Sequence, residues 1–166
     1  MALSTVVTTL IILVVSVLLA GVVTYFAVNV VSTRAQQESL QVTFAHVWVD
    51  SGGHSQAAFV IKNTGGRDVV INALQVRGIA GTFGTNIYTK AASTDPGALA
   101  ATTTLTATTA ATPITLASGS AIQLYVTEPT SVSINDIGTT IGITVFSANA
   151  MYYQETNVQA TGTSLP

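Results

Sequence analysis

The first 33 residues contain no Asp, Glu, Lys or Arg, and Arg34 is the first charged side chain. Hydrophobic residues run almost without a break from Leu10 to Val23 and again from Tyr25 to Val31, and no proline interrupts them. Apolar side chains fall on every face of the helix that this pattern predicts, which is typical of a helix with apolar surroundings on all sides. The stretch also exceeds the roughly 20 residues that cross a bilayer.

The rest of the chain is too small to enclose such a helix. Thirty-three helical residues span about 50 Å, whereas the remaining residues predict a globule about 36 Å across. Val, Ile and Thr recur from Thr5 to Thr33 and are only moderate helix formers, so the helix is not favoured alone in water. We therefore expect lipid, or the same helix from other copies of the chain, to surround it.

Two simpler interpretations of this segment remain open. A cleavable secretory signal begins with basic residues and carries about 7–15 apolar ones, whereas Met1 to Ser4 has no Lys or Arg and the apolar run is nearly twice as long. An ordinary membrane anchor is the other interpretation. Positive residues usually mark the cytoplasmic side of a span, so Arg34 fits an anchor with an external domain only if a basic leader was removed before Met1.

Small residues lie on one face of the predicted helix. Ser16, Ala20 and Thr24 are spaced by four, Ala27 follows three later, and Gly21 lies beside them. Small side chains let a second helix approach closely, so this face predicts a helix–helix seam. The residues expected to contact neighbouring helices are Leu3, Val7, Leu10, Ile11, Val14, Ser16, Leu18, Ala20, Gly21, Thr24, Phe26, Ala27 and Val31.

After a polar stretch expected to extend the helix to Ser39, the hydrophobic period becomes that of a strand. Strands are predicted at 40–48, 57–62, 69–76, 121–127, 141–147 and 152–158, with connections of hairpin length at 63–66 and 147–150. Trp48 and the other aromatic residues are expected in the core. The predicted fold is α+β: an N-terminal helix over 1–39, then an antiparallel, Ig-like β-sandwich over 40–166.

The segment 78–120 is less regular, and its Gly-x-x-Gly spacing is interpreted as turns. Residues 101–112 are rich in threonine, which predicts a surface loop or a weak edge strand. Threonine-rich surface tracts can carry O-linked sugars. The candidate positions are Thr102, Thr103, Thr104, Thr106, Thr108, Thr109 and Thr112.

Few residues suit catalysis or ligand binding. Charged residues make up 7% of the chain and the formal net charge is −2, so a nucleic-acid surface is not expected. Cysteine is absent. His46, Asp50 and His54 are spaced by four, and a turn could bring His54 to Asp50 as a weak metal site, but solvated or cross-strand histidines are the favoured interpretation. We expect no enzyme activity, no cofactor and no metal.

The segment Met1 to Gln37, an uncharged helix from the first residue with a short polar extension, resembles the mature N-terminus of the type IV pilin superfamily. More specifically it is similar to archaeal pilins and archaellins. The segment Val60 to Gly78 resembles the strands around a Gly-rich turn in archaeal pilin heads. Bacterial members usually carry Glu at the fifth mature position, where this chain has Thr5, and archaeal members often lack it.

The resemblance implies a structural subunit of an extracellular, adhesive type IV-like pilus. It implies removal of a basic leader by a prepilin peptidase, residence in the plasma membrane lipid before assembly, and polymerisation by a pilus assembly machinery into a cell-surface filament of identical copies. An archaellum filament for motility is an alternative, although archaellin helices are richer in Gly and Ala near their start. A membrane-anchored monomeric β-sandwich that binds a surface ligand is the other.

Overall fold

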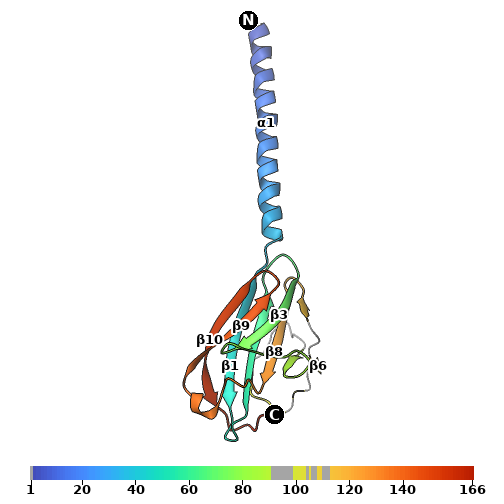
Figure 1. Cartoon of the computed structure of the whole chain (residues 1–166). Helices are drawn as coiled ribbons and strands as arrows, with labels where there is room; N and C mark the ends of the chain where they lie inside the picture. Colours follow the sequence, from blue (N-terminus) through green and yellow to red (C-terminus); the bar gives the residue numbers. More distant parts are fainter. Residues whose placement is uncertain (1, 91–98, 104, 106–107, 110–112) are drawn as a thin grey trace. The chain divides into compact units, whose positions relative to one another are not determined.

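The structure is a computed structural model that describes residues 2–90, 99–103, 105, 108–109 and 113–166. Contacts divide the chain into two compact units, 1–37 and 38–166. The first unit contains one helix, α1 (Ala2–Ala35), and the second, which we call the head, is rich in strands (Figure 1). The fold class is α+β, with a long N-terminal apolar helix followed by a mixed sheet.

The helix α1 ends at Ala35 and does not continue to Ser39 as the sequence suggested. The amide of Gln36 still donates to the carbonyl of Ser32 at 3.2 Å. The carbonyl of Ser39 instead accepts from the amides of Thr64 and Gly65 at 2.9 and 3.1 Å, so Ser39 belongs to the head. These bonds require an extended backbone there, which outweighs the helical propensity of the preceding polar residues.

Ten strands and one 3-10 turn are described in the head. The strands are β1 (Leu40–Val49), β2 (Ser55–Asn63), β3 (Val69–Val76), β4 (Ile79–Ala80), β5 (Ile87–Lys90), β6 (Thr108–Thr109), β7 (Ile114–Leu116), β8 (Ala121–Thr127), β9 (Thr140–Ser147) and β10 (Met151–Ala160), and the 3-10 turn is η1 (Ile134–Asp136). All six strands predicted from the hydrophobic alternation are present. Four short strands lie in the segment that sequence reasoning left irregular or assigned to a loop or weak edge strand.

The strands form one continuous hydrogen-bonded path, in the order β4-β3-β9-β10-β1-β2-β8-β5-β6, with β7 also paired to β3. The path curls into an open half-barrel (Figure 1). All pairs are antiparallel except β1 with β10, which run parallel from Val47↔Val158 to Val49↔Ala160. This pair joins the two halves of the sheet, so the head is a mixed sheet and lacks the clear separation of an antiparallel Ig-like sandwich.

The connection after β2 is not a hairpin, contrary to the sequence prediction. β2 pairs with β1 and β8, whereas β3 pairs with β9, β4 and β7. The side chain of Asn63 is fully buried, and its Nδ2 donates to the carbonyls of Arg67 and Leu116 at 2.8 and 3.0 Å. Its Oδ1 accepts from the amide of Gly65 at 3.0 Å. These bonds fix a crossing between the two halves of the sheet. The predicted hairpin between β9 and β10 is confirmed.

The main core lies on the concave side of the sheet. It contains alternate residues of the strands, among them Val47, Phe59, Ile71, Leu124 and Ile143, all fully buried. Regular alternation places these side chains on one face. Their burial is the main apolar contribution to the stability of the head.

A second, smaller cluster covers part of the opposite face. Trp48, Ala58, Val60 and Tyr125 from β1, β2 and β8 pack with Leu99 and Leu165. Beside it, Gln56 and Thr102 exchange two hydrogen bonds, Thr102 N to Gln56 Oε1 at 3.1 Å and Gln56 Nε2 to Thr102 O at 3.4 Å. The middle of β2 is therefore buried on both faces, which explains the unbroken apolar run Ala57 to Ile61 between its polar ends.

Candidate assembly surface

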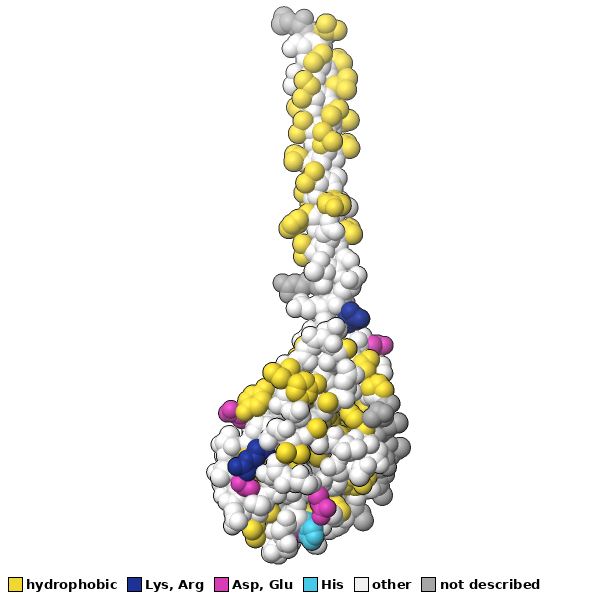
Figure 2. Space-filling view, in the orientation of Figure 1, with side chains coloured by type: hydrophobic (Ala, Val, Ile, Leu, Met, Phe, Trp, Pro, Cys, Tyr) yellow, Lys and Arg dark blue, Asp and Glu magenta, His cyan; other side chains and the backbone are white. Residues whose placement is uncertain are grey.

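The helix α1 is exposed along its length. Residues 3–33 are all exposed, and their large hydrophobic side chains keep 44 to 81% of their surface accessible. The exposed set includes every residue expected from the sequence to contact neighbouring helices, namely Leu3, Val7, Leu10, Ile11, Val14, Ser16, Leu18, Ala20, Gly21, Thr24, Phe26, Ala27 and Val31. Figure 2 shows hydrophobic side chains along the whole helix.

Such a surface is not stable in water. Burial of each large apolar side chain away from water contributes about 1.5–3 kcal/mol. Leaving the whole helix in water therefore forgoes a stabilisation on the order of 30 kcal/mol. That exceeds the roughly 5–15 kcal/mol by which a whole domain is stable. The span Leu3–Thr33 has a mean hydropathy of 2.9 and is long and apolar enough to cross a membrane. Its length and composition are those of a membrane anchor or a signal sequence.

Five hydroxyl groups on the helix donate to carbonyls within it. Ser16 Oγ donates to the carbonyl of Ile12 at 2.7 Å, and Thr24 Oγ1 donates to that of Ala20 at 2.8 Å. Thr8, Thr9 and Thr33 make equivalent bonds of 2.8 to 2.9 Å to carbonyls three or four residues earlier. Because each of these donors already has a partner, these hydroxyls add little desolvation cost when apolar groups surround the helix.

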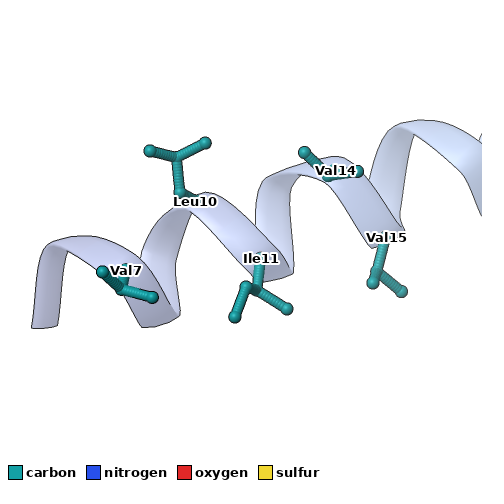
Figure 3. Close-up of a pocket in the computed structure, with 5 residues that line it drawn as sticks. All are labelled: Val7, Leu10, Ile11, Val14 and Val15. Carbon is teal, nitrogen blue, oxygen red and sulfur yellow. The ribbon is translucent and has the colours of Figure 1, made fainter. Parts of the chain in front are cut away.

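The helix presents apolar side chains in more than one direction. A shallow recess near its start is lined by Val7, Leu10, Ile11, Val14 and Val15. In Figure 3, Leu10 and Val14 project from one side of the ribbon, and Ile11 and Val15 project from the other. The small residues Ser16, Ala20, Thr24 and Ala27 are exposed, and an added Cβ at Gly21 would meet nothing within 4 Å. This surface has room for neighbours on several sides.

In the head, Asp50 and His54 come together as the sequence allowed. They lie at the two ends of the β1–β2 turn, where Gly53 adopts φ +89°. Asp50 Oδ1 accepts from the His54 amide at 2.9 Å, and Oδ2 lies 3.3 Å from His54 Nδ1. Oδ2 also accepts from the amide of Leu165 at 3.0 Å. The carboxylate thus holds a turn and the C-terminal segment together, a role that no local sequence signal indicated.

These bonds change the ionisation of Asp50. The Leu165 amide, followed by the His54 amide and imidazole, holds the pKa of this carboxyl below its ordinary value of 3.8, against an opposing effect of desolvation. His54 Nε2 lies 4.0 Å from Glu128 Oε1, so the imidazole sits between two carboxylates. The geometry is that of a structural clamp.

His46 is not part of this cluster. Its ring stacks on that of Trp48, with centroids 5.3 Å apart and planes 8° from parallel. Trp48 is buried in the second hydrophobic cluster, in agreement with its expected place in the core, whereas Phe44 and Tyr153, also expected there, are exposed. Across the described ranges, no group of three or more His, Asp or Glu side chains is placed to hold a metal ion.

The threonine tract is described only in part. Thr103 is exposed, and Thr102 is half-buried with its amide bonded to Gln56. Thr108 and Thr109 form β6, the edge strand next to β5. Thr104, Thr106 and Thr112 lie outside the described residues. The O-glycosylation of these positions stays a prediction.

Comparison with known proteins leaves the family open: no family model matches the chain, and no curated protein is significantly similar to it.

Proposed function

We propose that this chain is a structural subunit that polymerises through α1 into an extracellular type IV-like filament, serving adhesion. Before assembly, α1 resides in the plasma membrane, and after assembly the helices of many copies surround one another. Prepilin peptidase and a pilus assembly machinery are the implied partners. The proposal assigns the chain no catalytic role, no cofactor and no nucleic-acid binding.

The exposed apolar helix carries the proposal. Residues 3–33 are all accessible, while the head has its own core of strand residues. A helix that is apolar all round needs apolar surroundings on every side, and identical helices in a bundle supply them. A signal sequence or a simple anchor meets the same requirement through lipid alone. The resemblance of Met1 to Gln37 to pilin N-termini favours the polymer.

The small residues suggest how the helices associate. In lipid, helix association depends on close van der Waals packing, because burial from water contributes no further driving force there. Ser16, Ala20, Thr24 and Ala27 share one side of α1 and permit such an approach. A contact between two different surfaces of each copy that does not close on itself gives an open helical filament.

Two alternative functions are compatible with an apolar N-terminal helix and a β-rich head. An archaellum filament would use the same helix for motility, and a monomeric anchored head would use it only to stay in the membrane. The latter is favoured if the full chain remains monomeric in detergent and on the cell surface.

Electron microscopy of the purified full-length chain, after detergent removal, tests the proposal. We expect thin filaments of uniform diameter. Ala20→Leu enlarges the small-residue side without lowering hydropathy, so the variant should enter membranes normally but form few or unstable filaments. Val22→Leu changes a side chain on another face by one methylene, and serves as the matched control with normal filaments.

Persistent monomers of the unmodified chain under all assembly conditions would refute polymerisation and leave the anchored monomer. Normal filaments from Ala20→Leu would refute the role of the small-residue seam while leaving the polymer itself intact. Membrane insertion of each variant is checked by flotation with vesicles, which separates a packing defect from a targeting defect.

A further inference from the structure

Exposed large hydrophobic residues of the head are unevenly distributed. Within the described part of the head they are Phe44, Ile79, Ile134, Ile137, Met151 and Tyr153. Phe44 lies on β1, Ile79 on β4, and Met151 and Tyr153 on β10. The other two lie on η1 or just after it, and Arg77, which follows β3, holds η1 through a 2.6 Å ion pair with Asp136. None of the described residues of β2, β8 or β5 belongs to this set.

Four aromatic or apolar residues lie on the outer side of three neighbouring strands, β9, β10 and β1. We define the outer strip as Phe44 of β1, Phe146 of β9, and Met151 and Tyr153 of β10. Met151 is directly opposite Phe146. Ile143 and Val145 of β9 point into the main core, so Phe146, the residue after Val145, faces outward, where it is half-buried. The ring of Tyr153 lies over Gly142.

Phe44 completes the strip at an irregularity in β1. Its φ is +51°, and the register of β1 with β2 shifts between Thr43 and His46. Val42 and Ala45 on either side pack against the main core, whereas 58% of Phe44 is exposed. A positive φ is unfavourable for a bulky residue. The bulge therefore turns an aromatic side chain outward at a conformational cost.

The other half of the outer face is covered by the chain itself. There Trp48, Ala58, Val60 and Tyr125 are buried beneath Leu99 and Leu165. None of the described residues covers the outer strip in the same way. Met151 and Tyr153 are 63% and 58% exposed. Figure 2 shows hydrophobic side chains gathered on the head where β9 and β10 run in Figure 1.

We propose that the outer strip is the contact between the head of one copy and the head of the next copy in the filament. The inference rests on the proposed function, because packed helices are only about 8–10 Å apart while a head of this size has a radius of gyration near 14 Å. Heads on packed helices therefore meet wherever neighbouring copies are staggered along the filament axis by less than the width of a head. Burial of an apolar strip in that contact removes it from water.

The charges around the strip favour a second copy over a membrane surface. Two carboxylates lie beside the strip: Glu155 accepts from the Tyr153 hydroxyl at 3.2 Å, and Glu38 accepts from Asn149 in the β9–β10 turn at 2.8 Å. The nearby cation Arg77, whose amide donates to the Gly142 carbonyl, is paired with Asp136. Anionic lipid surfaces attract basic clusters, which this face lacks in the described residues. A low-charge apolar strip suits another protein surface of the same kind.

The absence of cysteine allows a direct test. Met151→Cys places a single thiol in the strip, and Lys62→Cys places one on the exposed outer side of β2 as the matched control. Maleimide labelling rates are measured for detergent monomers and for filaments. We expect labelling at position 151 to slow by about tenfold or more in filaments, because interface cores exclude water, and labelling at position 62 to change little.

Each outcome decides the inference. Filaments in which position 151 labels as fast as in monomers refute it while leaving the proposed function standing. Labelling that slows equally at positions 151 and 62 refutes the assignment of the contact to this strip. Labelling at position 151 that already slows in vesicle-bound monomers, before assembly, assigns the strip to lipid instead. Absence of filaments in the unmodified chain refutes the proposed function and this inference together, and microscopy identifies that case.

Discussion

At the residue scale, the ionisation of Asp50 is tied to the folded state of the head. Its folded pKa lies below the ordinary 3.8, chiefly because the Leu165 amide donates to it. A carboxyl with a depressed folded pKa contributes stability that is present above its unfolded pKa and is lost as the pH falls toward the folded pKa. We predict that the head loses this contribution below about pH 4, as measured by circular dichroism at stepped pH.

The Asp50→Asn variant should be less stable at neutral pH and should lose less stability on acidification than the unmodified chain. Asp136 needs a separate comparison, because its pKa is also lowered, first by Arg77 and then by Ser133. Asp136→Asn therefore serves as the parallel variant, and it should retain the Asp50 contribution. An Asp50→Asn curve parallel to that of the unmodified chain down to pH 2 would contradict the prediction.

Gly142 leaves space for the aromatic ring of Tyr153. An added Cβ at this position would overlap the far end of that ring, which belongs to a flexible side chain and can move aside. We predict that Gly142→Ala displaces the ring and destabilises the head by about 1 kcal/mol, near the lower end of overpacking costs. Urea unfolding in detergent measures this change.

The displaced ring provides a second signal. The Glu155 carboxylate, which accepts the Tyr153 hydroxyl, raises the pKa of that phenol. In Gly142→Ala the pKa of Tyr153 should move back toward 10.0, which ultraviolet titration detects. In a Tyr153→Ala background, Gly142→Ala should have little further effect, because the overlapping ring is gone. Equal destabilisation with and without the ring is the result that rules this explanation out.

At the element scale, β2 is the strand on which the head depends. It lies between β1 and β8, and both its faces are buried. Phe59→Ala removes a fully buried ring from its centre, and we predict a loss of about 3–5 kcal/mol in the free energy of unfolding. Ile79→Ala on the short strand β4, where the side chain is half exposed, should cost less than about 1 kcal/mol. Similar costs at both positions would mean that β2 is not the central element.

The long strands and the helix were predictable because their signals are local. Alternation over seven to ten residues identifies β1, β8, β9 and β10, and an uncharged run identifies α1. The strands β4, β5 and β7 contain only two to four residues, too few for a period to show. The parallel pairing of Val47 with Val158 joins distant parts of the chain, and no local pattern encodes it.

The false hairpin after β2 has a specific cause. Asn63-Thr64-Gly65-Gly66 has the composition of a tight turn, but the buried Asn63 amide bonds to Arg67 and Leu116 and sends the chain to the other half of the sheet. The exposure of the helix, in contrast, could be predicted, because the helix is too long for the head to enclose; which of its residues contact neighbouring copies stays a prediction. The Asp50–Leu165 contact could not be predicted, since it depends on where the last segment packs.

At the scale of the whole molecule, the two compact units differ in what they need from their surroundings. The head has its own core and its own hydrogen-bonded sheet. We predict that a chain beginning at Glu38 is soluble, folded and monomeric, with a β-type circular dichroism spectrum and cooperative thermal unfolding. Size-exclusion chromatography measures its state. It should form no filaments, because α1 is absent.

The full-length chain is the control for this truncation, and it should require detergent or lipid to stay in solution. An insoluble or unfolded truncated chain would show that the head depends on α1 for its folding. Filaments built from the truncated chain would contradict assembly through the helix.

The place of β1 in the sheet has a mechanical consequence. The chain leaves α1 through residues 36–39 and enters the head at the start of β1, a strand flanked by β2 on one side and by β10 along its far end. The bonds from β1 to β2 and β10 lie across the axis of β1. A pull along that strand would therefore load these bonds together in shear, and they could not open one after another from the end of the strand.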